Sequence, residues 1–353
     1  MSAAMQTLRT LKALHREGLL PVDPRLAEAA DAMAIAITPE MLALIDRADP
    51  ADPIARQFVP SAAETEIAAN ELLDPIGDEA RSPVKGIVHR YPDRVLLKPL
   101  HVCPVYCRFC FRREKVGPGG EALSASELDA AIAYIEARPE IWEVILTGGD
   151  PLMLAPRRLA KLIAALDAID HVGVIRIHSR VPIVDPSRVT DELLAALKPR
   201  RTALWFAVHC NHARELSVAA RAALARLADA GIPLIGQTVL LAGVNDEVET
   251  LETLMRALVT ARVKPYYLHH PDLVRGTGHF RVSVERGQAL MRALRGRLSG
   301  LAQPTYVLDV PGGHGKVPIG PGYLGDDPDA LPGALPGALL VEDAFGGRHR
   351  YPR

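Results

Sequence analysis

Short apolar runs alternate with amphipathic stretches between residues 94 and 300. The runs are nearly continuous in apolar residues, which is typical of strands covered on both faces of a parallel sheet. The stretches between them carry helix patterns. Ser124 and Glu127 have the spacing of a capping box. An apolar helical face runs from Val248 to Leu258. The predicted strands are residues 94–100, 142–146, 173–177, 203–208, 233–241 and 263–268.

The repeated strand-then-helix units predict an α/β fold with a parallel sheet and right-handed crossovers. Two architectures satisfy this pattern: an open doubly wound sheet, and a full or partial barrel. Barrel enzymes carry their chemistry at the rim formed by the C-terminal ends of the strands. Residues suited to chemistry follow the predicted strands in this way, which favours the barrel. They are Cys103, Gly148, His178, His209 and Asp272.

The regions on either side of the alternating pattern differ from it. An apolar pattern over residues 26–45, followed by a Pro- and Asp-rich stretch, predicts helices broken by loops. We therefore expect residues 1–88 to form an N-terminal helical cap and residues 89–300 to form the barrel domain. Residues 301–353 contain a strand-like piece at 305–309 and a Gly-rich turn, and are expected to form a C-terminal strand and turn extension. The pattern does not place the Pro- and Gly-rich end of the chain.

The composition describes an ordinary globular protein. Hydrophobic residues make up 48% of the 353 residues and the formal net charge is -1, so no nucleic-acid partner is expected. No apolar run is long enough to cross a bilayer and no secretory signal is present, so we expect a cytoplasmic protein with no membrane partner. Three of the four cysteines fall within eight positions, which indicates metal chemistry in a reducing compartment. Cys210 stands apart.

The three clustered cysteines are spaced as Cys103-Pro-Val-Tyr-Cys107-Arg-Phe-Cys110, directly after the first strand of the series. Thiolates at this spacing can wrap one cubane cluster and leave its fourth iron free. The alternatives are three unligated thiols or a zinc site, although zinc usually takes a second, distant CxxC pair that this sequence lacks. The segment resembles the signature of the radical S-adenosylmethionine superfamily, which implies a 4Fe-4S cluster and S-adenosylmethionine.

A Gly-rich turn, Thr147-Gly-Gly-Asp-Pro-Leu152, follows the second predicted strand. It resembles the turn of that superfamily that receives the amino group of S-adenosylmethionine, which implies roles for Gly148, Gly149 and Asp150. Backbone carbonyls and a carboxylate suit an ammonium. Taken alone, the same residues would indicate only a turn.

Further segments resemble the lysine 2,3-aminomutase family and extend over residues 52–319. The family implies a partial (β/α)6 TIM-like barrel, pyridoxal 5'-phosphate as a second cofactor, and exchange of an amino group between C2 and C3 of an amino acid. The segments are Asp74-Pro-Ile-Gly77, His89-Arg-Tyr-Pro-Asp-Arg94, Cys110-Phe-Arg-Arg113, Arg176-Ile-His-Ser-Arg180, His209-Cys-Asn-His212, Gln237-Thr-Val-Leu-Leu-Ala-Gly-Val-Asn-Asp246 and Val310-Pro-Gly-Gly-His-Gly-Lys316.

The resemblance implies roles for residues that would otherwise be interpreted as a turn lysine, surface arginines and a structural strand histidine. Lys316 matches the lysine that forms an imine with pyridoxal phosphate. Arg112 matches an arginine that binds the substrate α-carboxylate. The other implied contacts are Arg90 and Arg94 at the cofactor phosphate, Gln237 near the pyridoxal ring, and His209 and Asn211 near S-adenosylmethionine.

Substrate choice depends on two carboxylates, Asp272 and Asp309. A desolvated ε-ammonium needs compensating negative charge, so paired aspartates favour lysine and would repel a glutamate side chain. The lysine-using members of the family are acidic at both positions, although a single aspartate can equally cap a turn. In the implied reaction a reductant such as flavodoxin or ferredoxin supplies one electron through the cluster. One-electron cleavage of S-adenosylmethionine gives methionine and a 5'-deoxyadenosyl radical, which takes hydrogen from C3 of lysine. The amino group then moves from C2 to C3, and hydrogen returns from 5'-deoxyadenosine to give β-lysine.

The chain departs from the longer family members, which carry a zinc site built from a mid-chain cysteine and a C-terminal cysteine cluster. Glu247 occupies the first of these positions and the tail has no cysteine, so we predict no zinc. Because that site shapes the oligomer, a homo-oligomer stays an open alternative. His314 and Asp185 also depart from the family pattern, and neither change removes a proposed ligand.

Three other functions fit parts of the sequence. The short length resembles the branch of the family whose β-lysine is used to modify translation elongation factor P, with the same chemistry. Glutamate 2,3-aminomutase is disfavoured by Asp272 and Asp309. A non-catalytic iron-sulfur redox sensor would have no need of Lys316 or Arg112.

Overall fold

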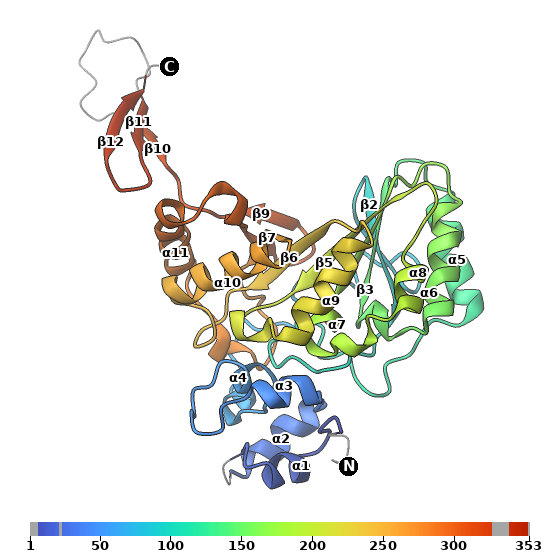
Figure 1. Cartoon of the computed structure of the whole chain (residues 1–353), viewed down its shortest axis with the longest axis horizontal. Coiled ribbons are helices and arrows are strands. Elements are labelled where there is room, and N and C mark those ends of the chain that lie inside the picture. Colours follow the sequence, from blue (N-terminus) through green and yellow to red (C-terminus); the bar gives the residue numbers. More distant parts are fainter. Residues whose placement is uncertain (1–5, 21–22, 327–338, 352–353) are drawn as a thin grey trace.

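The computed structural model describes residues 6–20, 23–326 and 339–351. Its centre is a nine-stranded sheet whose strands follow one another in chain order (Figure 1). Strands β2 to β8 are parallel, and β1 and β9 pair antiparallel with their neighbours at the two edges. The strands are β1 (Ile87–Tyr91), β2 (Arg94–Leu100), β3 (Glu143–Gly148), β4 (Val174–Ser179), β5 (Ala203–His209), β6 (Leu234–Val239), β7 (Val263–His269), β8 (Thr305–Val310) and β9 (Gly315–Pro318).

Helices connect consecutive parallel strands and cover the outer face of the sheet (Figure 1). Within the described residues, six strand-and-helix units run from β2 to α11 before β8, so the predicted partial (β/α)6 barrel is confirmed. Each strand predicted from the apolar runs lies within two residues of an observed strand end. The helices are α5 (Ala125–Glu136), α6 (Pro156–Asp167), α7 (Val181–Val184), α8 (Asp191–Ala196), α9 (Val218–Asp229), α10 (Val248–Thr260) and α11 (Val284–Arg297).

Two of these helices show why the sequence pattern was informative. Ser124 and Glu127 form the predicted capping box at the start of α5, with the Glu127 carboxylate accepting the Ser124 N–H at 2.8 Å. Helix α10 buries Leu251, Leu254 and Leu258 against the barrel, as its apolar face predicted.

Short helices form the N-terminal part of the chain, which packs on loops that follow the barrel strands. They are α1 (Leu11–Arg16), α2 (Arg25–Ala32), α3 (Pro39–Leu44), α4 (Ala55–Phe58) and the 3-10 turn η1 (Ala62–Thr65). The Thr38 hydroxyl, at the start of α3, donates to the Val184 carbonyl at 2.5 Å. Helices are therefore present where the cap was expected, and the domain boundaries at residues 88 and 300 stay predictions.

The open side of the barrel lies between the edge strands β1 and β9, and side chains bridge it. The Lys316 backbone N–H donates to the Tyr91 hydroxyl at 2.6 Å. Arg90 on β1 lies 3.7 Å from Asp309 on β8. Gly315 has a φ of +92°, and a Cβ there would lie 2.8 Å from the Tyr91 hydroxyl, so the turn requires glycine. This contact fixes the position of Lys316 relative to β1.

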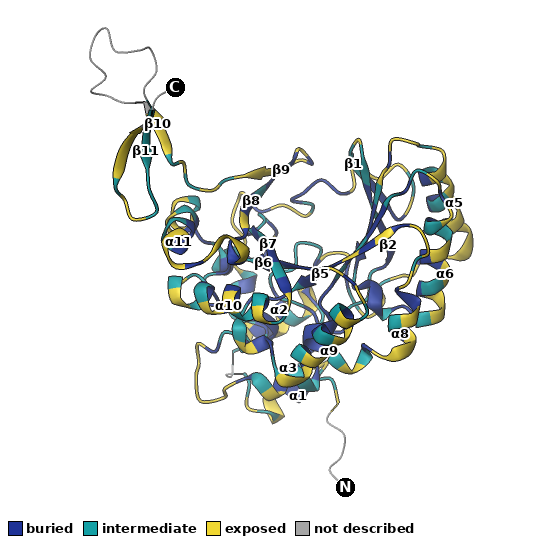
Figure 2. Ribbon diagram, turned by 45° about the horizontal axis from the view of Figure 1, so that its top comes forward, coloured by how far each residue is buried: buried dark blue, intermediate teal, exposed yellow. Residues whose placement is uncertain are grey.

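The apolar core lies between the sheet and its helices, where buried residues line the inner faces of α5 to α11 (Figure 2). After β9, a separate antiparallel sheet projects from the barrel near α11 (Figure 1). It consists of β10 (Leu324–Asp326), β11 (Leu339–Glu342) and β12 (Arg348–Tyr351), and is tied to α11 by an Arg292–Glu342 ion pair of 2.5 Å. No helix among the described residues has the length and hydropathy needed to cross a membrane.

Candidate active site

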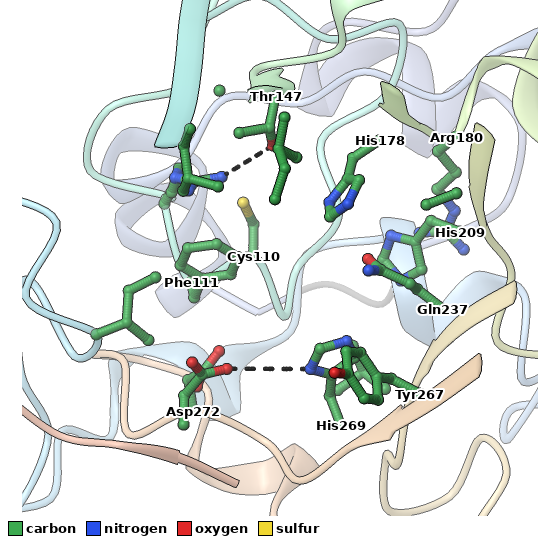
Figure 3. Close-up of a pocket in the computed structure, with 18 of the residues that line it drawn as sticks. Cys110, Phe111, Thr147, His178, Arg180, His209, Gln237, Tyr267, His269 and Asp272 are labelled. Atoms are coloured by element: carbon green, nitrogen blue, oxygen red, sulfur yellow. Dashed lines mark hydrogen bonds and ion pairs between the residues drawn. The ribbon is translucent and has the colours of Figure 1, made fainter. Parts of the chain in front are cut away.

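A cavity of about 690 Å³ opens at the C-terminal ends of the barrel strands, the position at which barrel enzymes carry their active sites. Figure 3 shows side chains from several strands and from the cysteine loop pointing toward one another across it. Its lining includes every predicted site residue except Asn211. These are Arg90, Arg94, Cys103, Cys107, Cys110, Arg112, Gly148, Gly149, Asp150, His209, Gln237, Asp272, Asp309 and Lys316.

The three clustered cysteines lie on the loop after β2 and form no disulfide. Burial raises the pKa of all three thiols, to about 11 for Cys110, so each carries its proton at neutral pH until a metal displaces it. Ligands of one metal ion converge on a point, and no group of three or more His, Cys, Asp or Glu among the described residues does so. A cubane takes its three ligands on three separate irons, and all three thiols line one cavity.

A buried ion triad anchors the cysteine loop to the helical cap. Glu64 accepts from Arg108 at 2.5 Å and from Arg113 at 2.8 Å, and all three side chains are almost completely buried. Arg108 also donates to backbone carbonyls of the cap, including that of Ala29 at 3.0 Å. The two guanidiniums share one carboxylate and also donate to backbone carbonyls, which lowers the cost of burying them. The sequence showed the arginines flanking Cys110 but not their partner, because Glu64 is distant along the chain.

Arg180 contacts a cysteine from behind the loop. Its guanidinium lies 2.8 Å from the Cys107 sulfur, and it also donates to Gln57 and Glu215 at 2.6 Å each. Neighbouring Cys107 and Glu215 raise the pKa of Arg180, although burial opposes them, so its charge is permanent. A cation at this distance favours the thiolate form of Cys107.

The Gly-rich turn after β3 has the glycines that its geometry requires. Gly148 has a φ of +110°, and a Cβ on Gly149 would lie 2.4 Å from the Val102 carbonyl oxygen. The Asp150 carboxylate accepts from the Ser179 hydroxyl and the Arg180 N–H, each at 2.8 Å. Asp150 therefore fixes the turn to the end of β4. Its predicted contact with S-adenosylmethionine stays a prediction.

The two residues predicted near S-adenosylmethionine at the end of β5 differ in position. His209 lines the cavity, and its Nε2 atom has no hydrogen-bond partner in the described part of the chain. Burial lowers its pKa, so a neutral imidazole faces the cavity. Asn211 is fully buried outside the lining. Its side chain donates to Gln57 at 3.1 Å and accepts from the Val239 N–H at 2.9 Å. These bonds give Asn211 a structural role, and its predicted cofactor contact stays untested.

One wall of the cavity carries cations that gather around a single carboxylate. Asp78 accepts from Arg112 at 2.9 Å and lies 3.3 Å from Arg90 and 3.4 Å from Lys98. Although burial opposes ionisation, Arg112 and Lys98 lower the pKa of Asp78 to about 2. We call these four residues the cationic wall. Arg90 and Arg112 reach the cavity, whereas Asp78 and Lys98 lie behind them.

Another part of the lining is acidic. Asp309 ion-pairs with the Lys316 ammonium, and Asp272 has no side-chain hydrogen bond or ion pair to any described residue. Burial and the neighbouring charge of Asp309 raise the pKa of Asp272 to about 7. We call Asp272 and Asp309 the acidic wall. Figure 3 shows Asp272 across the cavity from His178 and His209, and the His269 Nδ1 atom lies 4.0 Å from Asp309.

The remaining predicted contacts also reach the cavity. Gln237 comes from β6, and its side chain has no hydrogen-bond partner among the described residues. Arg94 comes from β2, pairs with Asp93 at 2.8 Å, and stacks 3.9 Å from the Tyr91 ring centre. Gln237 is therefore free to contact a ligand, whereas Arg94 already has one anionic partner.

The cysteine loop after the first strand of the series, the glycine turn after the next strand and the barrel that joins them together define a radical S-adenosylmethionine enzyme. The model of the radical SAM superfamily matches residues 97–255, and the model described as lysine-2,3-aminomutase matches residues 291–328. A radical SAM methyltransferase from Sphaerobacter thermophilus has a TM-score of 0.48 at 21% identity, covering 63% of this chain and 68% of its own.

Relatives with higher identity specify the family. The L-lysine 2,3-aminomutase of Acetoanaerobium sticklandii is 44% identical, covering 86% of this chain and 74% of its own length. That of Clostridium subterminale is also 44% identical, covering 85% and 72%. The glutamate 2,3-aminomutase of Clostridioides difficile is 39% identical, covering 82% and 68%. The chain belongs to the lysine 2,3-aminomutase family of radical SAM enzymes, a family that implies a 4Fe-4S cluster and S-adenosylmethionine.

Proposed function

We propose that this enzyme converts L-lysine to β-lysine. The observation that carries the proposal is the acidic wall, because Asp272 faces the cavity without a cationic partner among the described residues. An ω-ammonium group would supply the missing positive charge, whereas a glutamate carboxylate would add a third negative charge beside Asp272 and Asp309. Relatives of this chain are named for lysine and for glutamate. Of these two amino acids, the charge pattern favours lysine.

The side chains present fit pyridoxal phosphate. This cofactor needs an amine for covalent attachment and cations for its phosphate, and Lys316, Arg90 and Arg94 line one cavity with Gln237. When bound, it supplies a conjugated system that allows an amino nitrogen to migrate between adjacent carbons. Lys316 would be the attachment point, and its ammonium pairs with Asp309 in this structure. Asp309 also lies 3.7 Å from Arg90, so Asp272 is the carboxylate of the acidic wall left without a cationic partner among the described residues.

The residues present also fit the family's cluster and S-adenosylmethionine, which together would supply a carbon radical able to remove hydrogen from an unactivated carbon. Cys103, Cys107 and Cys110 would hold the cluster. The chain's own contribution is to place the substrate. Arg112 offers its outer nitrogens to the α-carboxylate, and the acidic wall takes the ε-ammonium. A substrate held at both ends has its C2 and C3 atoms fixed between them.

Two further parts of the proposal concern partners. A one-electron donor such as flavodoxin or ferredoxin would reduce the cluster, and β-lysine destined for elongation factor P would require no change in this site. Glutamate 2,3-aminomutase is the alternative substrate class, favoured by the 39% identical relative of that name and opposed by the acidic wall. An iron-sulfur redox sensor would give no functional role to Lys316 and Arg112.

The test is an anaerobic assay with reconstituted cluster, reductant, S-adenosylmethionine and pyridoxal phosphate, in which L-lysine and L-glutamate compete in one reaction. Mass spectrometry should find β-lysine and no β-glutamate. Formation of β-glutamate without β-lysine would identify glutamate as the substrate. The absence of both isomers would contradict the aminomutase activity. The Cys107→Ala variant should form no 5'-deoxyadenosine.

Covalent attachment of the second cofactor is tested separately. Borohydride treatment followed by peptide mass spectrometry should place pyridoxal phosphate on Lys316. The Lys316→Ala variant serves as the control and should carry no label. Labelling at another lysine would assign the attachment site to that lysine. The absence of any labelling would favour the iron-sulfur redox sensor.

A further inference from the structure

Asp78 stands behind the cavity rather than in it, at the point where three cations meet. Its segment is itself fixed: Asp74 accepts the N–H groups of Asp78 at 2.9 Å and Glu79 at 2.8 Å. Gly77 has a φ of +67°, and a Cβ there would lie 2.6 Å from the Gly313 nitrogen in the turn that precedes Lys316. The backbone that carries Asp78 is therefore held between the Asp74 carboxylate and the turn before Lys316.

The contact between Asp78 and Arg112 is specific to one edge of the guanidinium. Asp78 binds the Nε atom at 2.9 Å, and the Thr147 hydroxyl lies 3.4 Å from Nη1. The Arg112 guanidinium also lies 4.4 Å from the Phe111 ring centre. Nη2 has no hydrogen-bond partner among the described residues, and Arg112 lines the cavity. The Nε atom is thus occupied by Asp78, and Nη2 is left available to a carboxylate.

We propose that Asp78 is a positioning residue that selects for an α-carboxylate by aiming Arg112 into the cavity. The inference rests on the proposed lysine activity and adds the residue that sets its α-carboxylate selectivity. Two effects of Asp78 compete. Its negative charge reduces the attraction of the cationic wall for anions, while its hydrogen bond orients the guanidinium. Orientation decides the outcome because Arg112 keeps its own charge and the bound carboxylate lies at hydrogen-bond distance, where direction matters most.

The test compares L-lysine with 1,5-diaminopentane, which keeps both amino groups and lacks the carboxylate. Dissociation constants are measured from the change that each ligand causes in the absorbance of bound pyridoxal phosphate. In Asp78→Ala, binding of L-lysine should weaken roughly ten- to a hundred-fold, the effect of losing a hydrogen bond to a charged group. Binding of 1,5-diaminopentane should stay unchanged. Asp78→Glu, which restores the charge and an acceptor, should recover part of the lysine affinity.

Two controls separate positioning from a general structural role. Glu79→Gln removes the neighbouring carboxylate, which contacts exposed Lys115, and should bind both ligands like the wild type. In an Arg112→Gln background, Asp78→Ala should change lysine affinity by less than about twofold, because its effect passes through Arg112. Iron content, cluster absorbance and melting temperature show that each variant is folded and loaded. Asp78→Leu, which keeps a similar side-chain size and has no acceptor, replaces Asp78→Ala in every arm should the latter not fold.

Each outcome decides the inference. A selective loss for L-lysine that disappears in the Arg112→Gln background supports it. Three results would overturn it while the wild type still forms β-lysine. They are an equal loss of affinity for both ligands, an undiminished loss in the Arg112→Gln background, and no loss of affinity in a folded variant. A wild-type enzyme that binds and converts no lysine would contradict the proposed function itself, and the inference with it.

Discussion

The cationic and acidic walls line the same cavity and differ in how their carboxylates are balanced by cations. At the cationic wall, Asp78 is surrounded by Arg90, Lys98 and Arg112, and the pKa of Asp78 falls to about 2. At the acidic wall, Asp272 lacks a cationic partner among the described residues, and its pKa rises to about 7. Asp309 has cationic neighbours of its own, because it ion-pairs with Lys316 and lies 3.7 Å from Arg90. In the cationic wall the protein's own side chains neutralise Asp78. In the acidic wall no described side chain forms an ion pair with Asp272.

This contrast has a consequence for ligands. The cationic wall keeps a net positive charge and presents fixed donors, so it can receive anions without rearranging. The acidic wall is costly to ionise until a cation arrives, so a ligand with an ammonium group gains affinity there by stabilising Asp272 in its charged form. A ligand with a carboxylate at one end and an ammonium at the other satisfies both walls at once.

The largest expected effect comes from removing the acidic wall. The double variant Asp272→Asn and Asp309→Asn should lower kcat/KM for L-lysine by roughly a thousandfold, because the buried ε-ammonium loses both partners. The rate of β-lysine formation, followed by mass spectrometry, measures this loss. Asp185→Asn, which alters an aspartate outside the cavity lining, is the matched control and should react normally. A double variant with wild-type kcat/KM would show that the acidic wall does not bind substrate.

A smaller effect is expected from a conservative change in the cationic wall. Arg112→Lys keeps the charge but loses the paired donors, so the KM for L-lysine should rise by about tenfold to a hundredfold. Steady-state kinetics at saturating S-adenosylmethionine measures the change. Because Asp78 orients the Arg112 guanidinium through a hydrogen bond, the positive charge of a lysine alone should not restore binding of L-lysine. An unchanged KM would mean that the wall acts only as a positive field.

The smallest expected effect is the dependence of substrate binding on pH. Because the pKa of Asp272 is raised to about 7, this carboxyl is protonated and neutral below that pH. The charged neighbours that influence it are Asp309, Lys316, Arg112 and Arg90. Affinity for L-lysine should therefore fall as pH decreases, by about tenfold between pH 8 and pH 6. Asp272→Asn should flatten this dependence, and an equal slope in the variant would assign the titration to another group.

The sequence was most informative where one segment carries the whole pattern. Apolar runs located the parallel strands because both faces of each strand are covered, and the spacing of three cysteines identified their loop. Edge strand β1 was missed because it is less buried and includes His89 and Arg90, which break its apolar pattern. Strand β9 is short and follows a glycine-rich turn, so it has little pattern of its own.

Within the site, the sequence predicted the residues that reach the ligand better than those that hold them. Arg112 and Asp272 belong to recognisable segments, whereas Asp78, Glu64 and Arg180 acquire meaning only from partners far away in the chain. Asn211 shows the converse limit. It lies two residues after His209, beyond the end of β5, and its side chain makes its hydrogen bonds within the protein.

The most direct test of the two-walled cavity uses L-norleucine, which keeps the α-carboxylate and α-amino group of lysine and lacks the ε-ammonium. Dissociation constants for both amino acids are measured with the wild type and with Asp272→Asn, from the absorbance of bound pyridoxal phosphate. The variant should lose affinity for L-lysine by roughly ten- to a hundred-fold and bind L-norleucine at least as tightly as the wild type. An equal loss for both amino acids would contradict the account, because Asp272 would then not be recognising the ammonium.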